Sequence, residues 1–267
     1  MNKKRIIGIA LIIAIFIGLA ATIVYIFTEL KEETDIQIQT SETTDAKKFK
    51  SEYEDLNDKD ASEGKKYRVL SISDTNPIKY STASDIVNKI NNNESFVVYF
   101  GFSECPWCRS ILEALLESAN EYEVDTIYYV DVKNIRDKYE LDTETNTAVR
   151  TVEGTDGYYQ LINKLSNVLD DYEPLKYEVK QKNRKKKVVT VDIDEKRIYA
   201  PNVVLVKNGV GVLMTTGISD KLDDPYMELT DEIKNYSKTE FNKLFEEFKP
   251  KTTTTTESNV CTGQSNC

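Results

Sequence analysis

Apolar and polar residues alternate in short blocks from residue 67 onwards, and the blocks predict a layered α/β domain. Residues 67–73, YRVLSIS, have the alternation of an extended segment. Thr82 and Asp85 then have the spacing of a capping box, so we expect a helix over 82–91. The apolar run 96–100 follows and predicts a buried strand. This opening has the order β-α-β.

Two further helices and one strand are expected next. One helix is expected after residue 105, with an apolar face made of Ile111, Leu112, Leu115, Leu116 and Ala119. Residues 126–132, TIYYVDV, predict the next strand, which would pair through a parallel crossover. Asp156 is a candidate cap for a helix whose apolar positions are Tyr158, Leu161, Ile162, Leu165 and Val168.

The last third of the domain predicts extended segments and a final helix. Residues 186–200 read as extended, and Asn208-Gly209 between 202–206 and 210–214 is a strong hairpin turn. Ser237 to Glu240 has capping-box spacing and predicts an amphipathic helix. Its apolar positions are Phe241, Leu244, Phe245 and Phe248. The predicted order is β-α-β-α-β-α-β-β-α.

The N-terminal segment reads as a membrane anchor. Residues 6–27 carry no charge over 22 positions, which is long enough to cross the hydrocarbon core as a helix. The basic residues 3–5 precede this stretch, and acidic residues such as Glu29 follow it, so the N-terminus is expected in the cytoplasm and the rest outside. A cleaved signal peptide is the alternative, with GLAAT at 18–22 as the candidate cleavage region.

Composition divides the chain into four parts. Residues 1–27 form the cytoplasmic stub and anchor, and 28–66 a polar stalk with a short helix. Phe49, Tyr53 and Leu56 share one face of that helix, which either docks onto the domain or ends the stalk. The domain is expected over 67–250. A threonine-rich tail follows over 251–267.

Charge and histidine content exclude several function classes. The formal net charge is -10 and the pI is about 4.8, which disfavours nucleic-acid binding. The basic run 180–187 lies between acidic flanks and is interpreted as a solvated loop. Histidine is absent, which removes catalytic Ser-His and Cys-His pairs and all histidine metal ligands.

The candidate chemistry lies in the motif Cys105-Pro106-Trp107-Cys108. It stands between a buried strand and a helix, so Cys105 meets the positive end of the helix dipole, which favours a thiolate. Cys108, one turn further, is placed to attack a mixed disulfide formed by Cys105. Pro106 suits the first helical turn, and Trp107 offers an apolar surface to a substrate chain. Arg109 is expected to favour the thiolate mildly.

Other uses of these cysteines stay open at this stage. Glu104 is expected to oppose the thiolate. The pair could be a structural disulfide, since an extracytoplasmic compartment is oxidising. Zinc would need Cys261 and Cys267 as further ligands, and their spacing on a tail makes a metal site improbable. We therefore expect no metal and no cofactor beyond the cysteine pair.

The element order and the CPWC motif together resemble the thioredoxin superfamily over 67–248. The resemblance implies a thioredoxin-like α/β fold, a mixed central sheet flanked by helices. It also implies a cis proline before the last hairpin, which RIYAPNVVLVKNG places at Pro201, with Ala200 offering backbone groups to a bound extended peptide. The anchor, FKSEYEDLN and YFGFSECPWCRS further resemble the membrane-tethered bacteriocin transport accessory proteins of Gram-positive bacteria.

Three features depart from a plain thioredoxin. Tyr99 stands where the family has a buried aspartate, six residues before the first cysteine. The long separation of Cys108 and Pro201 implies an insertion within residues 133–197. Cys261 and Cys267 belong to no core motif, and they could close a small loop of their own or exchange disulfides with CPWC.

The resemblance implies a membrane-anchored extracytoplasmic thiol-disulfide oxidoreductase acting on exported proteins or peptides through mixed disulfides. Oxidase or isomerase work is favoured over reduction, since an outside reductase needs electrons carried across the membrane and one span offers no evident route. Its redox partner is not identifiable from the sequence. The alternative is a non-catalytic accessory protein of the same fold that holds an exported peptide or a transporter.

Overall fold

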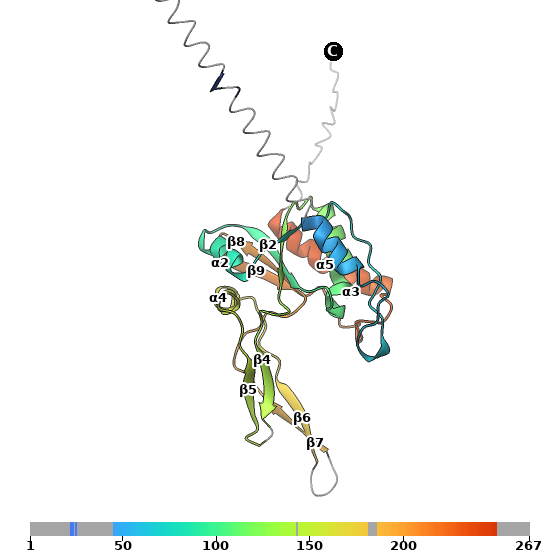
Figure 1. Ribbon diagram of the computed structural model, residues 1–267, viewed down its shortest axis with the longest axis vertical. Helices are drawn as coiled ribbons and strands as arrows, with labels where there is room; N and C mark the ends of the chain where they lie inside the picture. Colours follow the sequence, from blue (N-terminus) through green and yellow to red (C-terminus); the bar gives the residue numbers. More distant parts are fainter. Residues whose placement is uncertain (1–21, 24, 26–44, 143, 181–185, 250–267) are drawn as a thin grey trace, which may run out of the picture.

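A five-stranded mixed sheet forms the centre of the protein (Figure 1). The computed structural model describes residues 22–23, 25, 45–142, 144–180 and 186–249. The strands follow the order β1-β3-β2-β8-β9, with β1 and β2 parallel to β3, β8 antiparallel to β2, and β9 antiparallel to β8. They are β1 (Ile78–Tyr80), β2 (Phe96–Gly101), β3 (Ile127–Asp131), β8 (Asn202–Lys207) and β9 (Val210–Thr215).

Helices cover both faces of this sheet, which gives the mixed α/β architecture expected from the sequence. One layer contains α3 and α5, packed side by side, and the other contains α2 packed on α4 (Figure 1). The helices are α2 (Ala83–Asn91), α3 (Pro106–Glu121), α4 (Asp156–Leu165) and α5 (Asp231–Phe248). The predicted helix over 82–91 is confirmed together with its capping box.

Strand β2 lies in the middle of the sheet and is buried along its whole length. Because successive side chains of a strand point to opposite faces, Val97 and Tyr99 join the core under α3 and α5, while Val98 and Phe100 join the core under α2 and α4. A strand buried on both faces needs a continuous apolar run, which is why residues 96–100 were recognisable in the sequence.

The chain before the sheet packs onto the domain. Residues 45–54 are helical, and the side chains of Phe49 and Tyr53 are fully buried in the core with α3 and α5. The docking interpretation of this helix is confirmed. Leu56 lies beyond the helix and is half-buried.

The first predicted strand is wrong. Residues 67–73 join no sheet, and β1 is formed instead by Ile78–Tyr80. Backbone N–H groups of residues 67–73 donate to side chains instead of to a neighbouring strand. Asn57 accepts from the Leu70 N–H at 3.0 Å, and Glu54 accepts from the Ile72 N–H at 2.7 Å. These bonds to the docked N-terminal region take the place of a sheet ladder.

Two helices begin earlier than expected. Thr155, not Asp156, caps α4 by accepting from the Tyr158 N–H. Thr230 caps α5, so Ser237 lies inside the helix, where its hydroxyl donates to the Ile233 carbonyl at 3.2 Å. A capping-box spacing is therefore only a local signal, and an earlier cap displaces it when the helix can extend over buried residues.

The hairpin between β8 and β9 is confirmed. Asn208 and Gly209 both have positive φ, 51° and 74°, which is the backbone that a two-residue turn of this twist requires. A side chain at Gly209 would also meet the Ile90 carbonyl at 2.4 Å.

The expected insertion before Pro201 contains two β-hairpins that extend away from the main sheet (Figure 1). One is β4 (Lys138–Asp142) with β5 (Thr147–Val152), and the other is β6 (Leu175–Lys180) with β7 (Lys186–Val191). We call these two hairpins the arm. Helix α4, which separates them in the chain, packs on the main sheet with α2.

Several predictions fall on residues outside the described part of the chain. In the part that is described, no helix combines the length and the apolar character that crossing a membrane requires. Of the expected span 6–27, only residues 22, 23 and 25 are described. Most of the stalk, the centre of the basic run 180–187 and the tail with Cys261 and Cys267 lie outside as well.

Candidate functional site

Cys105 stands at the N-terminus of α3, directly after the turn that follows β2. It is the N-cap residue, with extended backbone angles of -75° and 114°, and its sulfur accepts a hydrogen bond from the Cys108 N–H at 3.3 Å. Pro106 occupies the first helical position, where its missing N–H costs no intrahelical bond. The helix therefore presents its free N–H groups to the Cys105 sulfur.

The loop before β8 lies against the same sulfur. Cys105 Sγ donates to the carbonyl oxygen of Ala200 at 3.3 Å. The Ala200–Pro201 peptide bond is cis, as the family resemblance implied. Residues 95 positions apart in the chain thus meet at one point, the edge of the sheet where β2 ends and β8 begins.

Trp107 is half-buried beside the cysteines. It packs against the core under α3 and against a small apolar cluster of Leu222, Leu229 and Ile233. The structure thus places all six residues predicted around CPWC and the proline loop in one neighbourhood, with Pro106, Trp107 and Ala200 half-buried and Pro201 buried. Ala200 is the residue of this loop that accepts a hydrogen bond from the Cys105 sulfur.

The two thiols differ in burial and acidity. Cys105 is 5% exposed and Cys108 is fully buried, and neither forms a disulfide. The hydrogen bond from the Cys108 thiol lowers the pKa of Cys105 below its ordinary value. Burial opposes this shift, and the N–H groups of Cys108 and Trp107 and the charge of Arg136 assist it. Burial raises the pKa of Cys108 well above its ordinary value.

Arg109 and Glu104, the two charged neighbours of the motif, each have partners other than the cysteines. The Arg109 guanidinium is buried and donates to the carbonyl of Tyr53 at 2.8 Å and to Asn57 at 2.8 Å, so it braces the docked N-terminal region. Glu104 pairs with Lys133 at 2.6 Å, and that hydrogen bond lowers the pKa of Glu104. Both charges are thereby engaged elsewhere.

Arg136 is the charged residue that sequence reasoning missed. It belongs to the turn after β3, with its guanidinium over the ring of Phe102 at 5.6 Å, and its charge lowers the pKa of Cys105. The parallel pairing of β2 and β3 could have pointed to this turn, because the turns that follow two parallel neighbours lie at the same edge of the sheet. Alternation alone does not reveal which side chain of such a turn faces the cysteine.

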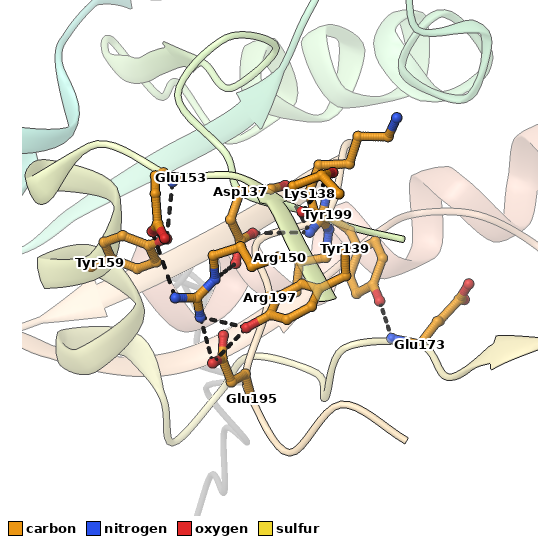
Figure 2. A network of polar contacts seen from close by, with 12 residues as sticks. Asp137, Lys138, Tyr139, Arg150, Glu153, Tyr159, Glu173, Glu195, Arg197 and Tyr199 are labelled. Atoms are coloured by element: carbon orange, nitrogen blue, oxygen red, sulfur yellow. Dashed lines mark hydrogen bonds and ion pairs between the residues drawn. The ribbon is translucent and has the colours of Figure 1, made fainter. Parts of the chain in front are cut away.

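A network of ionic contacts holds the base of the arm next to Arg136 (Figure 2). The buried Asp137 carboxylate pairs with Arg197 at 3.1 Å. Arg150 of β5 pairs with Glu195 at 2.5 Å, and Tyr139 of β4 donates to the same carboxylate at 2.7 Å. These contacts tie β4, β5 and the segment before β8 together, and so fix the backbone that carries Arg136.

In the part of the chain that the structure describes, no metal cluster involves the cysteines, and the hollow beside β1 lies away from them. In residues 45–142, 144–180 and 186–249, no group of three or more Cys, Asp or Glu side chains is arranged to hold a metal ion. A hollow of about 1030 Å³ lies elsewhere, at the edge of the sheet beside β1, and Asp74, Glu117 and Asp125 are among its lining residues.

Comparison of the chain with protein-family models, with curated proteins and with solved structures gives no match. The chemistry of the site therefore has to be argued from its own geometry.

Proposed function

We propose that the chain is a membrane-anchored extracytoplasmic thiol-disulfide oxidoreductase with a thioredoxin-like fold, of the type found in bacteriocin transport accessory proteins. The observation that carries this proposal is the position of Cys105 at the N-terminus of α3, 3.3 Å from the Ala200 carbonyl and 3.3 Å from the Cys108 N–H. A sulfur in that position has a lowered pKa and a second thiol one turn away, which are the two requirements of disulfide exchange.

The exchange we propose runs in two steps. A substrate thiolate attacks Cys105 in the Cys105–Cys108 disulfide, a substrate–Cys105 disulfide forms, and Cys108 leaves as a thiolate. A second substrate thiolate then attacks the substrate sulfur, which releases Cys105 as a thiolate. The substrate loses two electrons and the cysteine pair gains them, so the pair must be reoxidised by a separate redox partner.

Exported proteins or peptides are the proposed substrates. The Ala200 carbonyl stands beside the Cys105 sulfur, where the backbone of an extended chain could pair with it, and the half-buried Trp107 offers an apolar surface within the CPWC motif. Oxidase or isomerase work is proposed over reduction, because the single expected span provides no evident route for electrons from the cytoplasm.

The test uses the full chain in detergent and a peptide carrying two thiols. With glutathione disulfide supplied to reoxidise the cysteine pair, we expect the protein to form the peptide disulfide catalytically and Cys105→Ser to abolish turnover. Given the disulfide form of the same peptide, reduced Cys108→Ser should accumulate the substrate–Cys105 adduct, because the Cys105 thiolate displaces one peptide sulfur as a thiolate and no Cys108 thiol resolves the adduct. Trp107 is the only tryptophan, so its fluorescence in defined thiol buffers should report the reduction potential of the pair. Wild-type protein without turnover and Cys108→Ser protein without adducts would reject the proposal.

One observation favours a second function. Cys105 is only 5% exposed, which is little for a sulfur that must meet a macromolecular thiol. A non-catalytic accessory that holds an exported peptide or a transporter would need no accessible sulfur. The same experiment separates the two functions: the accessory protein would bind the peptide equally well after Cys105→Ser and would form no adduct.

A further inference from the structure

A pair of buried tyrosine hydroxyls lies behind Cys108. Tyr99 comes from β2 and Tyr53 from the helix over 45–54, and both side chains are fully buried in the same core cluster as Cys108. Their hydroxyl oxygens are 3.1 Å apart and share a hydrogen bond. The polar groups that share the core with the Cys108 thiol are therefore two neutral hydroxyls and not a charged side chain.

The backbone of β2 directs the Tyr99 hydroxyl towards the cysteines. A Cβ built on Gly101 would lie 2.5 Å from the Tyr99 oxygen, so the ring runs along the strand towards its C-terminal end and needs glycine there. Residues 102–105 continue from that end into the CPWC helix. The Tyr99 hydroxyl and the Cys108 thiol thus belong to one core cluster at this end of β2, and Tyr99 lowers the pKa of Cys108 against the effect of burial.

The exchange reaction requires Cys108 to become an anion inside the core. Cys108 must exist as a thiolate whenever it leaves or attacks a disulfide, yet full burial disfavours its anion. Tyr99 can stabilise this anion only as a hydrogen-bond donor, because burial raises the pKa of Tyr99 well above its ordinary value and keeps its hydroxyl protonated. A donor aimed in advance at a developing anion stabilises it most in a site that excludes water.

We propose that Tyr99 is a catalytic residue of the exchange reaction, its hydroxyl donating a hydrogen bond to the Cys108 thiolate while Tyr53 orients that hydroxyl. This inference rests on the proposed oxidoreductase function. The Tyr99 hydroxyl acts on the step in which the Cys105–Cys108 bond breaks and Cys108 leaves with both bonding electrons. It acts equally on the reverse step, in which the Cys108 thiolate expels the substrate thiolate from Cys105.

The direct test is Tyr99→Phe in the full chain, which removes one oxygen and keeps the ring. We expect the step that forms or consumes the Cys108 thiolate to slow by roughly tenfold to a hundredfold, the range for a hydrogen bond to a charged group. Rapid-quench trapping of the substrate–Cys105 adduct measures that step. The matched control is Tyr129→Phe, because the Tyr129 ring packs 5.4 Å from the Tyr99 ring but its buried hydroxyl lies outside the hydrogen-bonded pair.

The outcomes separate this inference from the function on which it rests. Wild-type turnover with an unchanged rate in Tyr99→Phe would overturn the role of Tyr99 and leave the oxidoreductase intact. No turnover in the wild type would reject the function itself. Equal slowing in Tyr99→Phe and Tyr129→Phe would also overturn the inference, because it would indicate loosened packing.

A second measurement needs no substitution at Tyr99. In the Cys105→Ser variant, carbon NMR can follow the Cys108 Cβ and the Tyr99 Cζ against pH, and we expect both signals to move with one midpoint. A Tyr99 signal that stays constant through the Cys108 transition would overturn the inference. The other ionisable groups that interact with Cys108, and whose signals must be followed in parallel, are Tyr53, Tyr129 and Arg136.

Discussion

At the scale of single residues, the acidity of Cys105 depends on groups drawn from two places in the chain. The Cys108 thiol and the N–H groups of the first helical turn come from α3 itself, and Arg136 comes from the turn after β3. All of these lower the pKa of Cys105, against the effect of its burial. The sulfur is therefore more acidic than its low exposure alone would suggest.

Replacing Arg136 by Gln should raise the pKa of Cys105, because it removes a positive charge that favours the thiolate. A lower thiolate fraction at neutral pH should slow alkylation of Cys105 by roughly twofold to tenfold, the effect of one charge at a partly buried site. The measurement is the alkylation rate of the reduced protein against pH. The wild-type curve should rise at lower pH than that of an ordinary thiol, and the variant curve should be displaced to higher pH.

Arg136→Lys is the control for this prediction, since it keeps the charge and changes only the shape of the group. Its curve should lie near that of the wild type. If Arg136→Gln and wild type gave superimposable curves, the contribution of Arg136 to the acidity of Cys105 would be refuted.

At the scale of elements, the two hairpins of the arm depend on contacts at their base. Neither hairpin joins the main sheet, and two-stranded ribbons alone are marginally stable in water. Arg150 links β5 to Glu195, and its guanidinium lies over the Tyr139 ring of β4 at 5.0 Å. The stability of the arm should therefore concentrate in this network (Figure 2).

Arg150→Ala should loosen the arm and leave the main sheet intact. The substitution removes the ion pair with Glu195 and leaves the buried Asp137 with Arg197 as its remaining partner, at a cost of about 1–2 kcal/mol. Hydrogen exchange should become faster in residues 138–152 and stay unchanged in β2. Lys138→Ala, which breaks an exposed pair with Glu140 on the same hairpin, should change exchange little. Equal protection in Arg150→Ala and wild type would show that the network does not hold the arm.

Some elements of the fold could be predicted from the sequence and others could not. Strand β2 and the β8–β9 hairpin were predicted because each depends on a local pattern, a continuous apolar run or a turn that requires positive φ. The segment over 67–73 was assigned wrongly, because side chains of Glu54 and Asn57, distant in sequence, take its backbone hydrogen bonds. A pattern of alternation does not tell a sheet ladder from such side-chain pairing.

At the scale of the whole molecule, the candidate site could be predicted as far as it follows from one continuous motif. Cys105, Pro106, Trp107 and Cys108 were found from their spacing, and Pro201 from resemblance. Arg136 and Tyr53 were missed, because each reaches the cysteines through tertiary packing of segments that no short-range pattern connects to them. Sequence reasoning thus found the candidate cysteines and missed part of the environment that sets their acidity.

The tail bears on the same chemistry. Helix α5 ends at Phe248, and ten residues lie between Pro250 and Cys261, enough chain to span at most several tens of ångströms. That reach would allow Cys261 or Cys267 to meet Cys105. A disulfide between Cys261 and Cys267 closes a short loop and requires no such encounter, so we expect the tail pair to be a passive bond.

Replacing both tail cysteines by Ser should therefore leave turnover and the redox state of CPWC unchanged, because Cys108 stands one helical turn from Cys105 and is placed to resolve adducts on it. The measurement is turnover of the dithiol peptide together with the oxidised fraction at CPWC, in the full chain with and without the double substitution. The Cys108→Ser variant sharpens the test, since without its resolving thiol Cys105 would be captured by any other cysteine within reach. A Cys105–Cys261 or Cys105–Cys267 disulfide found there by mass spectrometry, together with slower turnover of the double variant, would establish an internal relay instead.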